Sequence, residues 1–260
     1  MSKTLDSVVE ISRSVGSFLK SEQEKILATD IEMKGRSNDL VSRADKEAEK
    51  RFVTFLANLY PDSGFIAEEG TSEKKGEELN WIIDPLDGTT NYLYGIPCYC
   101  TSVALVKNGE LILGVIYDPE MDACFTAEKG QGAFLNGKKI SVSSQENIAH
   151  ALIATGFPYD DADRQRIYLD ILGEVNRQTR GIRRLGSAAL DMAYVACGRF
   201  DAFYEYGLQP WDVAAGAIII REAGGVVSDF KGGDEFLFGR TLACSNKSLH
   251  GNVLGFLKDW

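Results

Sequence analysis

The chain has 260 residues, 44% of them hydrophobic, and a formal net charge of −10 at pH 7. This size and composition are typical of a globular protein with one large domain or two small ones. The negative charge argues against a nucleic-acid-binding protein, which needs a basic face. Because charges interrupt residues 1–25 and no apolar run approaches about 18 residues, we expect neither a signal peptide nor a membrane span.

The first half of the chain, about residues 1–145, is predicted to form two helices and a sheet. Apolar residues at helical spacing predict helices over residues 5–19 and from about Asp45 to Tyr60. The later strands, joined by Asn-Gly and Asp-Pro turns, indicate an antiparallel meander. Strands are expected at residues 31–34, 65–67, 81–83, 102–106, 111–117 and 123–126.

The second half, about residues 146–260, alternates between strands and helices. This alternation predicts a layered α/β structure. Since no repeat or flexible linker separates the halves, we expect a single domain over residues 1–260. Strands are expected at residues 152–155, 182–185, 201–206, 226–229 and 242–244, and helices at 163–177, 187–197, 212–223 and 246–257.

Histidine and cysteine usage limits the chemistry that the chain can perform. Neither His150 nor His250 lies in a motif of a catalytic triad or a zinc site. The odd number of cysteines, without a CxxC pair, is typical of reduced thiols in a cytoplasmic protein. We therefore expect catalysis by carboxylates and hydroxyls, which bind hard cations such as Mg²⁺. The cysteines are Cys98, Cys100, Cys124, Cys197 and Cys244.

The segment 81–92 (WIIDPLDGTTNY) contains two carboxylates at a predicted strand end. Pro85 lacks a ladder donor and Asp87 begins a turn with a glycine, so the strand is predicted to end at Asp84. Threonines and an asparagine then open a helix. Asp84 and Asp87 could share metal ions about 3.5–4 Å apart, with the Leu86 carbonyl as a further ligand. The alternative is that both aspartates are turn and cap residues.

Two other acidic sites could complete such a centre. Glu68 and Glu69 follow an apolar strand, where they are either a solvated strand end or a ligand and a water-orienting group. Asp212 precedes a run of small residues and is either a helix cap or a group near bound phosphate at a helix N-terminus. Residues 132–138 have the spacing of a phosphate-binding loop, but Lys139 follows and no helix is predicted, so we interpret them as a hairpin.

These segments together resemble the inositol monophosphatase family over nearly the whole chain. The similarity is specific to the family and much less specific to a substrate within it. The segments that carry it are 39–45 (DLVSRAD), 67–69 (AEE), 81–89 (WIIDPLDGT), 186–189 (GSAA) and 211–216 (WDVAAG).

The resemblance implies a layered αβαβα sugar-phosphatase fold. It also implies a homodimer that hydrolyses phosphate monoesters with two or three Mg²⁺ ions and is inhibited by Li⁺. Asp84 would be shared between the first two ions, and Glu68 with Glu69 would support a more weakly held third. The metal ligands that it implies are Glu68, Asp84, the carbonyl of Leu86, Asp87 and Asp212.

The resemblance also implies roles around the water and the substrate. Thr89 and Asp45 would polarise the attacking water, with Glu68 and Glu69 as further catalytic groups and Lys34 nearby. The backbone of Gly88 and Thr89 would meet the phosphate. The substrate-side residues that it implies are Asp87, Gly88, Thr89, Gly186, Ser187, Ala188, Glu205 and Asp212.

The leading prediction is an inositol-1-phosphate phosphatase. Metal-assisted hydrolysis of a phosphate monoester needs no histidine, which agrees with the composition. The alternatives in the same superfamily are fructose-1,6-bisphosphatases, phosphoadenosine phosphatases and histidinol phosphatases, although no basic pocket for a second phosphate is evident. Arg183 and Arg184 are interpreted as structural or dimer-contacting residues. The alternative of another class is a regulatory protein that keeps the fold and binds a macromolecule.

Overall fold

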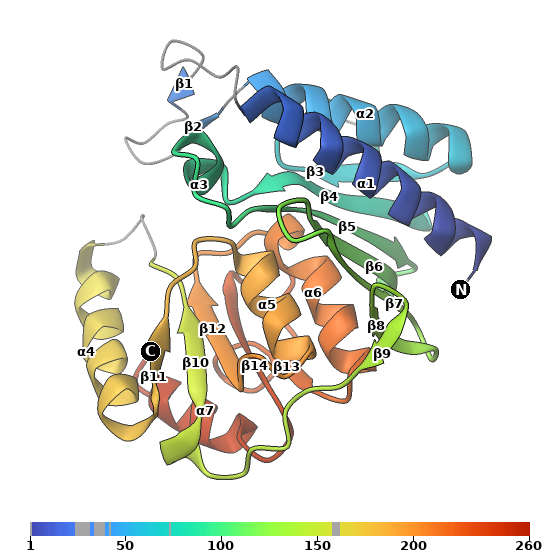
Figure 1. The fold of residues 1–260 in the computed structure, drawn as a ribbon. Helices are drawn as coiled ribbons and strands as arrows, with labels where there is room; N and C mark the ends of the chain where they lie inside the picture. Colours follow the sequence, from blue (N-terminus) through green and yellow to red (C-terminus); the bar gives the residue numbers. More distant parts are fainter. Residues whose placement is uncertain (1, 24–31, 34–39, 42, 73, 158–161) are drawn as a thin grey trace.

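The computed structural model describes residues 2–23, 32–33, 40–41, 43–72, 74–157 and 162–260. Figure 1 shows five layers: helices α1 and α2, a seven-stranded sheet, helices α5 and α6, a five-stranded sheet, and helices α4 and α7. The predicted αβαβα order is therefore confirmed. No helix in these ranges combines the length and the apolar character that crossing a membrane would require.

The first layer pairs α1 (Lys3–Gln23) with α2 (Arg43–Leu59). Their apolar stripes form one core with the seven-stranded sheet, as the helical spacing predicted. The inward face of α2 also carries two acids, because Asp45 and Glu49 are one turn apart and almost fully buried. Strands β1 (Glu32–Met33) and β2 (Leu40–Val41) form a small antiparallel pair beside this layer.

The seven-stranded sheet follows chain order, and only its first pair is parallel. The predicted meander is confirmed. The turns at Asn108-Gly109 and Asn136-Gly137 have positive φ at both residues, as two-residue hairpins require. The second of these turns makes residues 132–140 a hairpin, as predicted. The strands are β3 (Gly64–Ala67), β4 (Leu79–Asp87), β5 (Cys100–Lys107), β6 (Glu110–Asp118), β7 (Ala123–Glu128), β8 (Gly132–Leu135) and β9 (Lys138–Ile140).

Strand β4 extends further than the sequence predicted. Its end was expected at Asp84 because Pro85 lacks an N–H donor, but pairing with β5 continues to Asp87. The register shifts between Asp84 and Asp87, so Pro85 lies in a β-bulge where no ladder hydrogen bond is required of it. The prediction of an abrupt strand end was wrong, and the two aspartates lie on either side of a bulge.

Helix α3 (Thr89–Leu93) begins after a glycine rather than after a side-chain cap. Its N-cap, Gly88, has φ 97°, and no side chain caps the helix. A Cβ at this position would lie 2.9 Å from the Cys98 carbonyl oxygen, so both conformation and space require glycine. Asn91, expected to help open the helix, donates from Nδ2 to the carbonyls of Cys98 at 2.7 Å and Leu185 at 2.8 Å.

The central layer consists of α5 (Ala188–Ala196) and α6 (Pro210–Glu222), which are buried between the sheets. Small residues allow close packing here. A Cβ on Gly216 would lie 2.7 Å from Met192, and a Cβ on Gly114 would lie 2.8 Å from the Ala215 carbonyl oxygen. This close packing therefore fixes the positions of α5 and α6 relative to the seven-stranded sheet. The N-termini of both helices point toward the end of β4.

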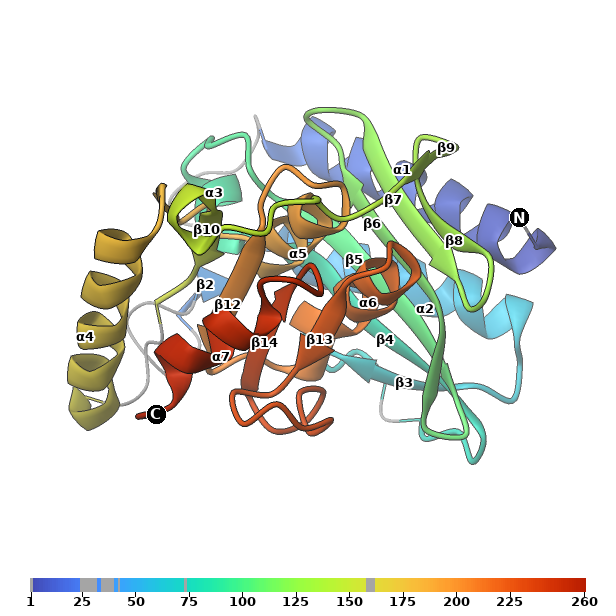
Figure 2. The ribbon, with the colours of Figure 1, turned by 90° about the horizontal axis from the view of Figure 1, so that it is seen from below.

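The five-stranded sheet has the order β11-β10-β12-β14-β13 and is mixed in direction. Figure 2 shows α7 crossing below this sheet and α4 at its side. The last helix begins at His250 rather than at the predicted residue 246, because Asn246 accepts a hydrogen bond from Leu249 N and forms a turn. The remaining elements are β10 (Leu152–Thr155), β11 (Gly181–Arg183), β12 (Ala202–Tyr206), β13 (Val226–Ser228), β14 (Thr241–Ser245), α4 (Ala162–Gln178), α7 (His250–Leu257) and a 3₁₀ turn (Ile148–His150).

Candidate active site

Asp84 lies at the centre of the candidate site. It is 1% exposed, and its Oδ1 accepts a hydrogen bond from Leu86 N at 3.0 Å across the bulge. Its Oδ2 accepts no hydrogen bond from the described residues. Burying an ionised carboxylate is costly unless its charge is neutralised, so this position favours either a bound cation or a proton on Asp84.

Thr89 and Asp45, which the family resemblance pairs, lie within hydrogen-bonding distance of each other. Thr89 Oγ1 lies 3.3 Å from Asp45 Oδ2 and 3.0 Å from the Leu86 carbonyl oxygen, to either of which it donates. A hydroxyl has one hydrogen, so its lone pairs stay available to accept a hydrogen bond from a water. The hydroxyl is therefore oriented by α2 and β4 together.

Asp87 is held by the N-terminus of α5. Its Oδ2 accepts hydrogen bonds from Ser187 Oγ at 2.7 Å and from Ala189 N at 2.6 Å. Burial raises the pKa of Asp87, and these hydrogen bonds together with the Arg184 charge oppose that rise. The predicted substrate residues Ser187 and Ala188 thus lie directly beside a predicted metal ligand.

Asp212 is in the first turn of α6, as predicted. Its Oδ2 accepts from Gln209 N at 2.7 Å within a capping box, which confirms the capping interpretation of its local role. Its Oδ1 accepts no hydrogen bond from the part of the chain that is described. Capping and ligand binding are therefore compatible, because each role uses a different oxygen.

Glu68 and Glu69 follow the end of β3. Glu68 N donates to the Ile83 carbonyl at 3.3 Å, which places Glu68 beside Asp84 on the neighbouring strand. Glu69 N donates to Glu49 Oε2 at 2.6 Å. The structure therefore brings Glu68 to the acidic group and ties the backbone of Glu69 to α2.

The charges of these acids act on one another. Burial raises the pKa of Asp84 well above its usual range, and the charges of Glu68, Asp87, Asp212 and Asp45 raise it further. Burial likewise raises the pKa of Asp212, followed by the charges of Asp87 and Glu68. Acids from four separate elements therefore share one electrostatic environment, in which a divalent cation would relieve the repulsion.

The donor set fits a hard cation, since it consists of carboxylates and a carbonyl. Within the described ranges, no three His, Cys, Asp or Glu side chains converge as a ready-made ligand group. Asp87 and Asp212 each direct one oxygen to a donor in their own surroundings.

The substrate side is formed by β12, β10 and the turn before α5. A Cβ on Gly156 would lie 2.0 Å from Glu205 Oε1, and Gly186, with φ 97°, faces the Arg184 guanidinium. Burial raises the pKa of Glu205 to about 8, although the Arg184 charge opposes this and the Asp87 charge adds to it. Glu205 therefore shares its electrostatic environment with Asp87.

Residues 1–258 match the model of the inositol monophosphatase family. The chain belongs to this family. It is 40% identical to an inositol-1-monophosphatase of Mesorhizobium japonicum, covering 99% of this chain and 97% of the relative. It is 38% identical to the Nus factor SuhB of Escherichia coli strain K12, covering 100% and 97%.

Solved structures of family members have the same fold. The extragenic suppressor protein suhB of Bartonella henselae superposes with a TM-score of 0.93 at 40% identity, covering 99% of both chains. The Thermotoga maritima IMPase superposes with a TM-score of 0.90 at 37% identity, covering 99% of this chain and 98% of that one. The predicted family and fold are therefore confirmed.

Two buried acids near the family's motifs were missed by the sequence reasoning. Glu49 follows Asp45 by one helical turn and is fully buried. Asp191 in α5 is 1% exposed, and its Oδ1 has no hydrogen-bond partner among the described residues. Burial raises the pKa of Asp191 well above its usual range, and Glu205 and Asp87 raise it further. The available signals were the position of Glu49 three residues before Phe52 on the apolar stripe of its helix and the position of Asp191 inside an apolar helical run.

Three basic residues remain from the sequence analysis: Lys34, Arg183 and Arg184. Lys34 is outside the described residues. Arg184 lies 5.9 Å from the ring centroid of Phe157 and affects the pKa of Asp87 and Glu205, so it is closer to the family site than the sequence indicated. Arg183 donates to the Ile182 carbonyl and contacts none of the predicted ligands among the described residues.

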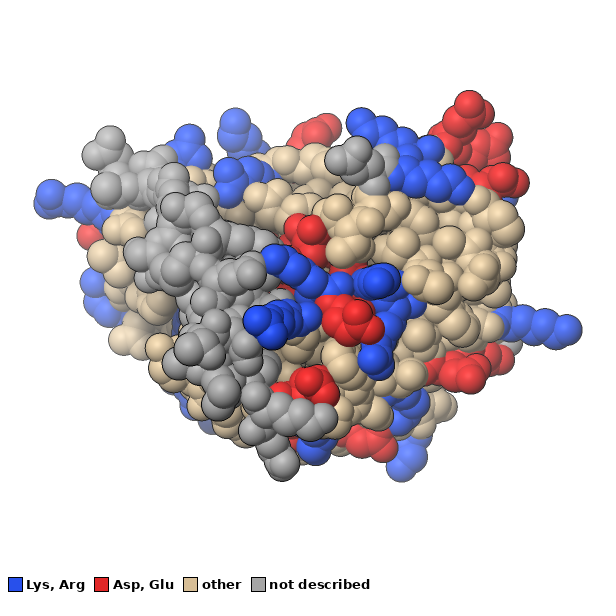
Figure 3. Space-filling view, turned by 90° about the horizontal axis from the view of Figure 1, so that it is seen from above, with Lys and Arg blue, Asp and Glu red and all other residues tan. Residues whose placement is uncertain are grey.

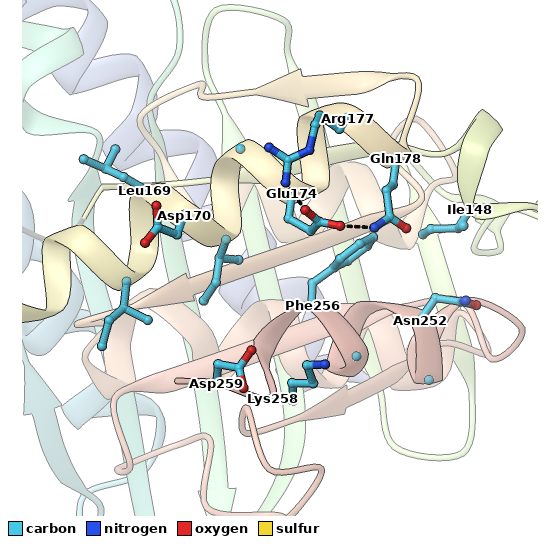
Figure 4. Close-up of a pocket in the computed structure, with 15 residues that line it drawn as sticks. Ile148, Leu169, Asp170, Glu174, Arg177, Gln178, Asn252, Phe256, Lys258 and Asp259 are labelled. Carbon is cyan, nitrogen blue, oxygen red and sulfur yellow. Dashed lines mark hydrogen bonds and ion pairs between the residues drawn. The ribbon is translucent and has the colours of Figure 1, made fainter.

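A cavity of about 880 Å³ lies between α4 and α7 (Figure 4). None of the predicted site residues lines it. Three of its polar groups pair with one another, because Glu174 accepts hydrogen bonds from Arg177 and Gln178. This groove is therefore separate from the carboxylates.

Proposed function

We propose that the protein is a Mg²⁺-dependent phosphatase that hydrolyses myo-inositol 1-phosphate or a related sugar or polyol phosphate. The observation that carries this proposal is the shared electrostatic environment of Glu68, Asp84, Asp87 and Asp212, with the Thr89–Asp45 hydrogen bond beside it. Family membership supports the phosphatase chemistry.

Two or three Mg²⁺ ions are proposed. When bound, they supply activation of a water and stabilisation of charge on the phosphate and on the leaving oxygen. Glu68 and Glu69 support the weakest ion in this proposal. The residues that would hold the ions are Glu68, Asp84, the Leu86 carbonyl, Asp87 and Asp212.

Thr89 and Asp45 orient the attacking water in this mechanism. Asp45 Oδ2 accepts the Thr89 hydroxyl hydrogen, and Thr89 Oγ1 then accepts a hydrogen bond from the water. Because one hydrogen of the water then points to Thr89, a lone pair of the water oxygen points away from Thr89. The Thr89–Asp45 pair therefore orients the water and provides a route for one of its protons. Both contributions depend on the position of α2 against β4.

The substrate is held by backbone and side-chain groups around the site. The backbone of Gly88 and Thr89 meets the phosphate, and Gly186, Ser187 and Ala188 face the polyol. Glu205 keeps its proton at neutral pH because its pKa is raised to about 8, so it can donate to a substrate hydroxyl as well as accept from one.

Metal dependence and substrate choice are tested with the purified protein. Phosphate release is expected to vanish in chelator, to return with Mg²⁺ and to be inhibited by Li⁺. A panel of phosphate monoesters compared by kcat/KM identifies the substrate class and includes fructose 1,6-bisphosphate, a phosphoadenosine phosphate and histidinol phosphate. Turnover that persists in chelator would contradict the mechanism. If myo-inositol 1-phosphate were the poorest substrate, the specific name would be wrong.

A regulatory role is the second candidate, because several relatives that match the full chain are named Nus factor SuhB. The face over α1 and α2 carries intermixed positive and negative side chains (Figure 3), and its Arg13, Lys20 and Arg51 pair with acids. This favours a protein partner over nucleic acid at that face. A hydrolysis-deficient variant that still restores the phenotype of a gene deletion would favour the regulatory role.

The remaining expectations are proposals of the same kind. We expect a homodimer, a single domain over residues 1–260 and a cytoplasmic location. Analytical ultracentrifugation tests the first, limited proteolysis near residues 145–146 the second, and cell fractionation the third.

A further inference from the structure

Glu49 is a fully buried acid beside the proposed metal site, and neither the proposed metal ligands nor the proposed catalytic groups include it. It lies on the inward face of α2, one turn after Asp45. Burying a charged side chain is costly unless hydrogen bonds compensate for it. Its partners therefore show what it does.

Both oxygens of Glu49 bind the turn that follows β3. Oε2 accepts from Glu69 N at 2.6 Å, and Oε1 accepts from Thr71 N at 2.7 Å. Gly70 between them has φ 65°, a conformation that turns neighbouring N–H groups toward one concave side. The turn thus forms an anion-binding concavity, and Glu49 is the anion within it.

This contact fixes Glu68 from one side, and β4 fixes it from the other. Glu68 N donates to the Ile83 carbonyl, and the next N–H along the chain, that of Glu69, donates to Glu49. The peptide groups on both sides of Glu68 are therefore held, so its side chain starts from a fixed point next to Asp84. The charge of Glu68 is the largest repulsive influence on the pKa of Asp84.

We propose that Glu49 is a positioning residue for cation binding, which holds the turn 68–71 so that Glu68 stays beside Asp84. This inference rests on the proposed function, because it assumes that Glu68 binds the metal. Glu49 itself directs each oxygen to a backbone donor and is not among the proposed metal ligands.

Two acceptor oxygens are essential to this role. A glutamine would present one oxygen and one amide group, so one of the two backbone N–H groups would face another donor. Glu49→Gln therefore removes one hydrogen bond and introduces a repulsive contact, with almost no change in volume. Outer partners that orient metal ligands change metal affinity by roughly 10–100-fold when they are replaced.

The test is calorimetric titration of Mg²⁺ into metal-free protein. For Glu49→Gln we expect the Mg²⁺ dissociation constant to rise by about 10–100-fold. At saturating Mg²⁺, kcat should return to near the wild-type value, since no catalytic group has been removed. Glu49→Asp keeps the charge but retracts the oxygens, so an intermediate loss of affinity is expected; this variant also serves if Glu49→Gln does not fold.

Glu222 provides a matched control. Its two oxygens accept hydrogen bonds from Gly130 N at 2.8 Å and Gly132 N at 2.7 Å, in a turn away from the site. Glu222→Gln likewise removes one backbone hydrogen bond, so it should lower the midpoint of thermal unfolding but leave Mg²⁺ affinity unchanged.

Three outcomes separate the two proposals. If a folded Glu49 variant binds Mg²⁺ as tightly as wild type, Glu49 is only structural and the inference is overturned. If the wild type binds Mg²⁺ and the variant loses affinity, but neither hydrolyses any ester, the inference stands and the proposed function fails. If the wild type binds no Mg²⁺, both are overturned.

Discussion

Two acids of the candidate site, Asp84 and Asp212, and two acids that bind turns elsewhere in the molecule show opposite hydrogen-bonding patterns. We call the second pair, Glu222 and Asp201, the outer-turn acids. Glu222 and Asp201 each use both oxygens on donors: Glu222 on two glycine amides, and Asp201 on Ser143 Oγ at 2.6 Å and Leu152 N at 2.7 Å. Asp84 and Asp212 each accept a hydrogen bond on one oxygen only, within the described residues.

This difference distinguishes two uses of a carboxylate. A carboxylate with donors on both oxygens organises a turn and needs nothing further. A buried carboxylate with one oxygen left over remains under-compensated, and several such acids that raise one another's pKa are neutralised either by a proton or by a cation. Glu49 belongs to the first kind although it lies beside the second, which is why we assign it a positioning role. The following predictions test this distinction.

The largest expected effect is on catalysis. Asp87→Asn removes a charge from the proposed metal site, so phosphate release should fall by at least about 1000-fold, or about 4 kcal/mol of barrier. Circular dichroism should show an intact fold, because the amide oxygen can still accept from Ser187. Asp201→Asn, which changes one of the outer-turn acids, is the control and should keep near wild-type activity. Substantial residual turnover by Asp87→Asn would remove Asp87 from the metal site.

The second effect is on stability, and its sign separates the two kinds of acid. In chelator at pH 7, Asp84→Asn should raise the free energy of unfolding, since a neutral amide replaces a buried acid whose charged form is disfavoured by burial and by the neighbouring acids. Asp201→Asn should lower it by about 1–3 kcal/mol, because one donor loses its acceptor. Urea unfolding measures both. Destabilisation by Asp84→Asn would place Asp84 with the structural acids.

The smallest effect concerns Glu205. Its folded-state pKa is raised to about 8 by burial, so between its ordinary value and pH 8 the folded protein binds a proton that the unfolded chain has lost. The free energy of unfolding should therefore fall as pH rises through this window. Relative to Glu205→Gln in chelator, wild type should lose roughly 1–2 kcal/mol between pH 5 and 9, a value reduced for partial exposure. A pH-independent difference would mean that Glu205 ionises normally.

Most of the fold could be predicted because the spacing of apolar residues along the chain indicates which side chains are buried. The helices of the first layer, the meander and its Asn-Gly turns followed from local patterns. The end of β4 did not, since the rule that proline ends a strand assumes regular pairing, and the bulge at Pro85 removes that assumption. The start of α7 was also wrong, because the side chain of Asn246 forms a turn before the helix.

The site could be predicted in part. The resemblance supplied the acids, and the structure brings Thr89 to Asp45 and Asp87 to Ser187 across long stretches of sequence. Glu49 and Asp191 were missed because both lie in helices whose apolar spacing was interpreted as core alone. A hydrogen bond between a side chain and a backbone amide far along the chain leaves no pattern in the local sequence. The role of Glu49 could therefore be recognised only from the structure.

Asn91 has a consequence for recombination between homologues. Its single amide group joins the chain just before β5 to the chain just before α5, while Ser187 and Ala189 hold Asp87 across the same boundary. A chimera that takes residues 1–145 from one relative and 146–260 from another keeps the Asn91–Cys98 contact whole, but takes the two sides of the Asn91–Leu185 contact and of the Asp87 contacts from different parents. Functional exchange of halves therefore depends on compatibility at positions 87, 91 and 185–189, whatever the overall sequence identity of the parents.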